Sequence, residues 1–203
     1  MKQSSALFLL VFLFSTSGTY AQESGSLDEM NMLLSKNLKY PAELRQEGIE
    51  GPVVVSVKVD PRGTLTGEYE FLSGNLAFEE EIERTLNVLK ENWNPSFLED
   101  KSYDLEYLMS FDFKLSKGAG FPPNPFMNTS QKSEEISPLM AVTQALEENP
   151  YFPPLYKNRA EILKSEGKEI LAEMDLNQAK FLKGKMLTEI VIVGYLPSGP
   201  KSL

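Results

Sequence analysis

The stretch from Tyr103 to Leu115 restricts the fold most, because its apolar residues fall on every second position. A period of two residues is typical of a β-strand that buries one face. The intervening positions are charged or polar except for Leu108. The apolar positions are Tyr103, Leu105, Tyr107, Met109, Phe111, Phe113 and Leu115. A strand of this kind is not stable alone, so the chain must provide further strands and an apolar cover for them.

A second alternating stretch provides the partner strands. Valine occupies every second position from Val53 to Val59, and the segment 60–63, Asp-Pro-Arg-Gly, follows as a tight turn. Residues 64–72 then form the second strand of a predicted hairpin. Pro41 fits the first turn of a short helix that ends at Gly48.

A longer helix is predicted over residues 76–93, where apolar side chains recur at helical spacing and Pro95 follows. Residues 31–117 therefore predict an α+β domain, in which two helices cover one face of a three-stranded antiparallel sheet. Within the predicted helix, Glu79, Glu80 and Glu81 fan around the axis. This spacing favours a solvated surface over a pair of catalytic carboxylates.

The first residues have the pattern of a secretory signal peptide. Lys2 precedes an apolar run from Ala6 to Phe14, and small residues follow up to Ala21. We expect residues 1–21 to be cleaved after Ala21, which would place the protein in the periplasm or cell envelope. The alternative is a retained membrane anchor, although the apolar run is shorter than the roughly 20 residues that span a bilayer. Residues 22–30 are rich in Glu, Ser and Gly and are predicted to be flexible.

Composition excludes several classes of function. The chain has 20 basic and 29 acidic residues, a net charge of −9, so we do not expect nucleic acid as a partner. It contains no histidine and no cysteine, which excludes Ser-His-Asp and Cys-His catalysis and thiolate zinc sites. No nucleotide-binding or calcium-binding motif is present. We therefore predict a protein that is not an enzyme, with no cofactor, no metal and no small-molecule substrate.

The C-terminal part changes to a helical period. Residues 118–136 contain several prolines among polar residues and are predicted to be a linker. Helices are expected within residues 137–183, beginning at the capping residue Ser137. The tail, residues 184–203, contains a short apolar strand at 189–195.

The order of features from Tyr40 to Leu115 resembles the C-terminal domain of TonB, the periplasmic energy transducer. The matching features are Tyr40-Pro41-Ala42, Gly48, Gly51, the valine strand, the turn at 60–63, Trp93-x-Pro95 and the long final strand. The resemblance implies a domain that grips other polypeptides, with receptor peptides adding along the final strand. Leu38 and Lys39 stand where the family often carries polar contact residues, so receptor specificity does not carry over. The partner contacts expected on this basis are Tyr103, Leu105, Tyr107, Met109, Phe111, Tyr40 and Lys39.

Residues 137–183 resemble a tetratricopeptide repeat. The signature positions are Tyr156, Ala160, Leu163, Gly167, Ala172, Leu176 and Ala179, whereas Arg159 replaces an apolar residue. One full repeat with one preceding helix is fewer than a free-standing solenoid needs, so the unit should lean on the first domain or on another chain. Tyr156 and Asn158 are its candidate partner contacts.

The segment 187–195 resembles a stretch near the plug of outer-membrane receptors from the Bacteroidetes group, close to the box that TonB grips. Ile190, Val191, Ile192, Val193 and Tyr195 have the composition of a strand without a partner of its own. We predict that they pair with the edge at 103–115, within one chain or between two chains of a strand-exchanged homodimer. An ordinary buried strand is the simpler alternative.

These features predict a non-enzymatic envelope module that binds extended peptides by strand addition and is uncoupled from the TonB motor. An outer-membrane receptor or another envelope protein is the expected partner. The alternative is a TonB-type energy transducer for receptor transport that keeps its N-terminal segment as an anchor.

Overall fold

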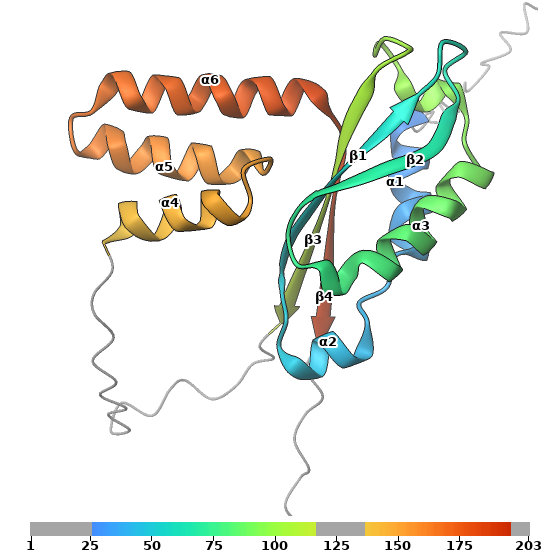
Figure 1. Cartoon of the computed structure of the whole chain (residues 1–203), viewed down its shortest axis with the longest axis horizontal. Helices are drawn as coiled ribbons and strands as arrows, with labels where there is room; N and C mark the ends of the chain where they lie inside the picture. The colour runs from blue at the N-terminus through green and yellow to red at the C-terminus, as the bar shows by residue number, and fades with distance from the viewer. Residues whose placement is uncertain (1–25, 117–136, 196–203) are drawn as a thin grey trace, which may run out of the picture.

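The computed structural model describes residues 26–116 and 137–195 of the 203-residue chain (Figure 1). The predicted signal peptide and linker lie outside these residues. The helices are α1 (Ser26–Asn37), α2 (Ala42–Glu47), α3 (Glu79–Glu91), α4 (Pro138–Glu148), α5 (Pro153–Ser165) and α6 (Glu169–Lys185). The strands are β1 (Gly51–Val59), β2 (Leu65–Ser73), β3 (Glu106–Ser116) and β4 (Met186–Tyr195), and short 3-10 turns span Leu76–Phe78 and Pro95–Leu98.

The four strands form one sheet in the order β2-β1-β3-β4. β1 lies between β2 and β3 and is antiparallel to both, whereas β4 runs parallel to β3. A parallel neighbour requires a long crossover, which here contains the three helices α4, α5 and α6. The predicted antiparallel strands are therefore extended by the C-terminal strand into a single mixed sheet.

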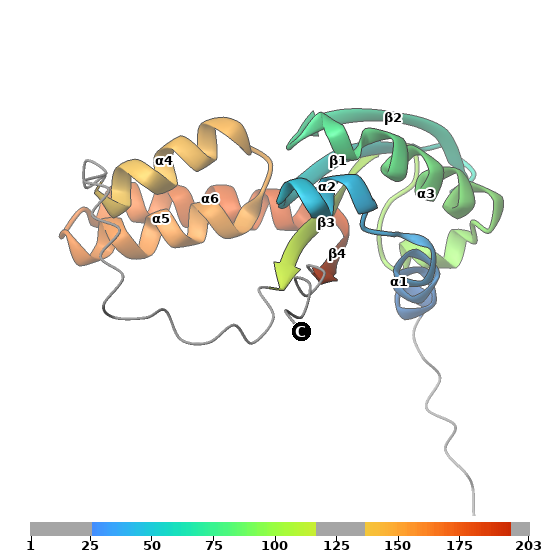
Figure 2. The same ribbon diagram turned by 90° about the horizontal axis from the view of Figure 1, so that it is seen from below.

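Helices α1 and α3 cover one face of the sheet (Figures 1 and 2). The apolar positions of β1 from Val53 to Val59 and of β3 from Tyr107 to Phe113 point into this layer, where they meet α1 and α3. The largest buried side chains include Phe78, Phe111, Phe113, Met30, Leu34, Ile82 and Leu89. The residues between the strands and the helices thus form one hydrophobic core.

Helix α1 corrects the prediction of a flexible segment for residues 26–30, because the helix begins at Ser26, while residues 22–25 lie outside the described residues. Met30 and Leu34 are almost fully buried, and Leu27 packs against the same core. These three residues are spaced by three and four positions, as on one face of a helix. The polar residues around them favour a flexible segment, so the sequence does not predict this helix.

The other face of the sheet contacts the C-terminal helices. Val54 of β1 and Leu108 of β3 pack with Leu182 of α6 and Met186, and Phe152 and Tyr156 lie against this cluster. Leu108 is the residue that breaks the alternation of its strand, and this contact explains it. The C-terminal helices therefore lean on the sheet, as their small number predicts.

Candidate peptide-binding edge of the sheet

The edge of β3, where the sequence predicts peptide addition, is occupied by β4 of the same chain. The pairing runs from Leu108 opposite Met186 to Ser116 opposite Tyr195, with one register shift between Leu108 and Met109. The sequence left open whether the tail pairs within one chain or between chains. In this structure it pairs within one chain, and the outer edge of the sheet moves to β4.

Three of the expected partner contacts on β3 are core residues instead. Met109 and Phe111 are fully buried, and Tyr107 is nearly so. The hydroxyl of Tyr107 donates a hydrogen bond to the carbonyl of Ser102 at 2.5 Å, and burial raises the pKa of this phenol. The alternation that suggested a contact surface points these side chains toward α1 and α3, where no partner can reach them.

The other two expected β3 contacts lie before the strand begins. Tyr103 and Leu105 are about half exposed, and Asp104 between them has a positive φ of 59°. A left-handed residue interrupts an extended chain, so the strand starts at Glu106 rather than at 103. The ring of Tyr103 lies over Gly63, where an added Cβ would approach it to 2.9 Å.

Tyr40 packs against the end of β4 and does not form part of a free surface. Its ring packs edge-on against Phe78 and Phe113, and its hydroxyl donates to the carbonyl of Ile49. Burial, with a smaller contribution from the charge of Glu50, raises the pKa of the Tyr40 phenol. A Cβ added at Gly194 would come within 2.7 Å of this ring. The Gly-Tyr pair of the tail therefore has a steric reason, since only glycine lets the strand approach Tyr40.

Lys39, the neighbouring expected contact, is exposed. Its backbone N–H donates to the Glu81 carboxylate at 2.5 Å, and Arg84 binds the same carboxylate. This contact fixes the backbone before α2 and leaves the Lys39 side chain free to face solvent.

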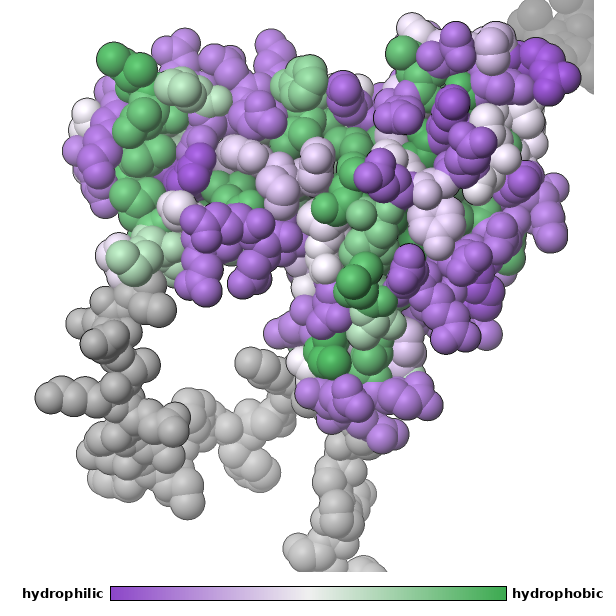
Figure 3. All heavy atoms as spheres, in the orientation of Figure 1, coloured by the Kyte–Doolittle hydropathy of each residue, from purple (hydrophilic) through white to green (hydrophobic). Residues whose placement is uncertain are grey.

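The tail itself has one buried and one exposed face. Ile190 is buried and Ile192 half-buried on the side of α1, whereas Val191, Val193 and Tyr195 are 55%, 47% and 68% exposed. Figure 3 shows hydrophobic residues on the surface over the lower half of the sheet. Within the part of the chain that the structure describes, β4 has no strand on its outer side.

The two edges of the sheet are protected to different degrees. The β2 edge contains Gly67 and the exposed carboxylates Glu68 and Glu70, and its pairing with β1 has two register shifts. Charges and irregular register discourage the addition of another strand. Residues 190–193 of β4 contain no charge, glycine or proline, so this edge is open to strand addition.

In the helical unit, Tyr156 is held at the contact with the sheet. Its hydroxyl donates to the carbonyl of Pro150 at 3.0 Å, and its ring packs against the cluster around Leu108. Asn158 is exposed on α5. The structure does not bring these two residues together with the β4 edge as one surface.

Arg159, the departure from the repeat pattern, has a structural role that the sequence does not reveal. Its guanidinium forms two hydrogen bonds of 2.7 Å with the carboxylate of Asp175 on α6. These bonds raise the pKa of Arg159, and the buried Asp175 keeps a charged partner. The pair joins α5 to α6.

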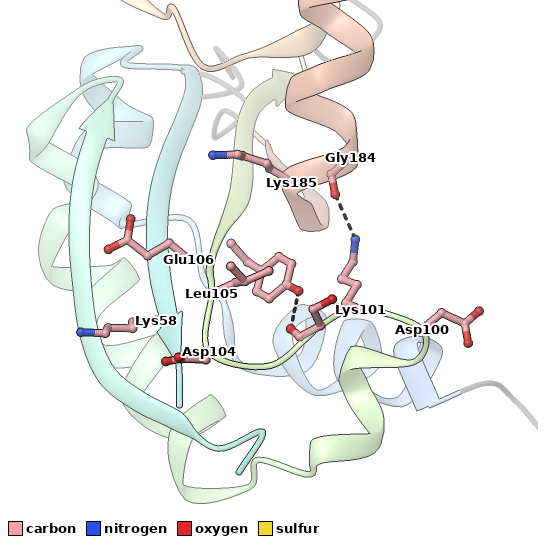
Figure 4. Close-up of a pocket in the computed structure, with 10 residues that line it drawn as sticks. Lys58, Asp100, Lys101, Asp104, Leu105, Glu106, Gly184 and Lys185 are labelled. Atoms are coloured by element: carbon pink, nitrogen blue, oxygen red, sulfur yellow. Dashed lines mark hydrogen bonds between the residues drawn. The ribbon is translucent and has the colours of Figure 1, made fainter. Parts of the chain in front are cut away.

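An open pocket of about 690 Å³ lies where the start of β3 meets the junction of α6 and β4 (Figure 4). Lys101 crosses it, and its Nζ donates to the carbonyl of Gly184 at 3.4 Å. The charged residues of its lining are Lys58, Lys101, Lys185, Asp100, Asp104 and Glu106. Three cations and three carboxylates balance, so the pocket favours neither an anion nor a cation. Among the described residues, no group of three potential metal ligands is present.

Comparison with known proteins finds one family that matches the first part of the chain. Residues 36–115 match the family described as "Gram-negative bacterial TonB protein C-terminal". A solution NMR structure of the Helicobacter pylori TonB C-terminal domain is similar, with 20% identity and a TM-score of 0.30. That similarity covers 43% of this chain and 90% of the other. No curated protein matches the chain.

Residues 36–115 are thus similar to the TonB C-terminal family. In residues 26–116 and 137–195, no helix combines the length and apolar character needed to cross a membrane.

Proposed function

We propose that the protein is a non-enzymatic envelope module that binds an extended polypeptide along the outer edge of β4. The observation that supports the proposal is an edge strand of ten residues, Met186–Tyr195, whose central part has no protecting charge. An incoming strand would satisfy the outward-facing backbone groups of β4 and continue the sheet.

The exposed face of β4 sets the chemistry of the partner. Val191, Val193 and Tyr195 project from the same face, so cross-strand neighbours on the partner would lie beside them. β-Branched or aromatic residues at alternate positions of the partner make the most favourable pairs with such side chains. The expected partner segment is therefore extended, apolar at every second residue and without proline.

The proposal changes the strand to which the partner adds. The resemblance to TonB implies addition along residues 103–115, but β4 already pairs with this strand. In our proposal, the tail is a built-in fourth strand that presents a new edge. An outer-membrane receptor or another envelope protein would provide the added segment. A strand-exchanged homodimer would instead use the β3 edge, because the tail of each chain would replace β4 beside β3 of the other chain. The tetratricopeptide-like character of α4 to α6 stays a prediction.

Uncoupling from the TonB motor is also part of the proposal, with the anchored energy transducer as its alternative. The mass of the protein isolated from the envelope separates the two. A chain that begins at Gln22 supports the uncoupled module, whereas a chain that retains the apolar run from Ala6 to Phe14 supports the transducer.

Site-specific photo-crosslinking tests the binding edge. A photoreactive amino acid at Val193 should cross-link an envelope protein, whereas the same group at Met140, which is also exposed but lies on α4, should not. The cross-linked segment is then identified and synthesised as a peptide. Adding that peptide should slow amide hydrogen exchange in residues 187–195. Equal cross-linking at both positions, or unchanged exchange in β4, would refute strand addition at this edge.

A further inference from the structure

Helix α6 exposes a line of large apolar side chains on the side away from α5. Ile170, Met174 and Phe181 are 77%, 62% and 57% exposed, and Asn177 lies between them on the same side. The opposite side of the helix is buried and consists of Ala172, Asp175, Ala179 and Leu182. α5 lies between α4 and α6, so α6 forms one outer side of its unit (Figure 1), and Figure 3 shows hydrophobic residues exposed over this unit. We call Ile170, Met174, Asn177 and Phe181 the α6 seam.

The spacing of the α6 seam is that of a helix that pairs with another helix. Its members are separated by four, three and four residues, which is the alternation of the two core positions of a heptad. Three exposed apolar residues in one line on a 17-residue helix exceed the single exposed apolar residues that are usual on a soluble surface. Asn177 is the polar member, and a polar residue in such a seam fixes register and orientation.

Charges beside the α6 seam select the direction of pairing. At 100° per residue, Glu173 and Lys180 flank the seam on one side and Lys185 on the other. In an antiparallel pair, like flanks meet, so Glu173 of each copy approaches Lys180 of the other. In a parallel pair, opposite flanks meet and Lys180 would approach Lys185. Antiparallel pairing also places Ile170 opposite Phe181 at both ends.

We propose that two copies of the chain associate through the α6 seam, with the two α6 helices antiparallel around a two-fold axis near Met174 and Asn177. A second copy fits this face because the pattern is complementary to itself, as a two-fold interface requires. An anionic lipid surface fits less well, since Glu169 and Glu173 stand beside the apolar residues and the chain has a net charge of −9. The α6 seam shares no residue with β4.

The association is expected to be weak, because one short helix from each copy buries less area than a typical permanent interface. Sedimentation of the full chain should therefore show a monomer–dimer equilibrium that depends on concentration. Met174→Asp and Phe181→Asp should each weaken the dimer at least tenfold, while Leu76→Asp, at an equally exposed site outside α6, should leave it unchanged. Circular dichroism checks that all three variants are folded.

Charge reversal and cysteine cross-linking test the direction of pairing. Glu173→Lys and Lys180→Glu should each weaken the dimer, and the double variant should restore it. Because the chain contains no cysteine, Asn177→Cys near the axis should form an intermolecular disulfide on mild oxidation, whereas Ile170→Cys should not. A chain that stays monomeric at millimolar concentration, or an Ile170→Cys variant that cross-links to itself, would overturn the proposal. Sedimentation with anionic vesicles that is lost in Phe181→Asp, without any dimer, would assign the seam to a membrane instead.

Discussion

The sheet domain and the C-terminal unit differ in how they bury their apolar residues and pair their strands. Residues 26–116 contain three strands and the two helices, α1 and α3, that cover them. Residues 137–195 contain three helices and one strand, and this strand obtains its hydrogen bonds and its core from the first unit. We infer that the C-terminal unit depends on the first unit for its stability. β4 completes the sheet and, in our proposal, presents its own outer edge to a partner.

The largest effect is expected from a core substitution in the sheet domain. Phe111 is fully buried between β3 and the covering helices, so Phe111→Ala should destabilise the protein by about 4 kcal/mol through lost apolar burial and a cavity. Urea unfolding followed by tryptophan fluorescence measures this, because Trp93 packs against the same core. If the C-terminal unit depends on the sheet, the helical circular dichroism signal, to which both units contribute, should be lost in a single step at the same urea concentration. Separate transitions would show that the two units are independent.

A smaller and more local effect is expected from the ion pair within the C-terminal unit. Asp175→Ala leaves the guanidinium of Arg159 without its bidentate partner and should cost about 3 kcal/mol. Replacing both members, as in Arg159→Met with Asp175→Leu, should recover most of this loss because no uncompensated charge stays behind. Hydrogen exchange should locate the loosening in α5 and α6 and not in β1. An equal increase of exchange in β1 would contradict the division into two units.

The difference between the two units also explains what could be predicted from the sequence. The strands of the sheet domain and its turn follow from local alternation and from Asp60 to Gly63, and these elements are present in the structure. The same alternation predicts that Tyr107, Met109 and Phe111 are buried, whereas the resemblance to a peptide-binding strand predicts that they contact a partner. The structure buries all three. α1 was missed because its few apolar residues are separated by polar ones.

Long-range pairings could not be read from the sequence, because no local pattern encodes them. Arg159 and Asp175 are 16 residues apart and meet only when α5 and α6 fold back on each other. The contact between Gly194 and Tyr40 joins residues at opposite ends of the described chain. The composition of the tail predicts a strand that pairs with the edge of the sheet. Its parallel direction could not be predicted, because it depends on the crossover through three helices.

The docking of the tail can be weakened without changing either core. Gly194→Val adds a branched side chain where even a Cβ would lie 2.7 Å from the ring of Tyr40. We expect a loss of about 2 kcal/mol from overpacking and faster amide exchange at residues 190–195. Tyr40→Ala in the same chain should relieve the clash and slow exchange at 190–195 again. Gly184→Val is the matched control, because nothing lies within 4 Å of its Cβ position. Unchanged exchange in Gly194→Val would mean that the end of β4 is not held by Tyr40.

The smallest effect is expected at the β1–β2 turn, far from the contact between the units. The carboxylate of Asp60 accepts hydrogen bonds from the backbone N–H groups of Thr64 and Arg62, at 2.8 and 2.9 Å. The bond from Thr64 is the largest cause of the lowered pKa of Asp60. Burial opposes it, and the individually smaller contributions of Arg62 lower the pKa further. A carboxylate whose pKa is lower in the folded state stabilises the protein at pH values above its pKa in the unfolded state, which is about 3.9 for aspartate. This contribution is lost as the pH falls through the pKa of the folded state. Asp60→Asn should therefore lower the melting temperature slightly at pH 7 and by less at pH 2.5, compared with Asp100→Asn at an exposed position. Since this turn belongs to the sheet domain alone, the same substitution should leave amide exchange in α5 and α6 unchanged. Faster exchange in these helices would show that the turn and the C-terminal unit are coupled in a way that the contacts between the units do not explain.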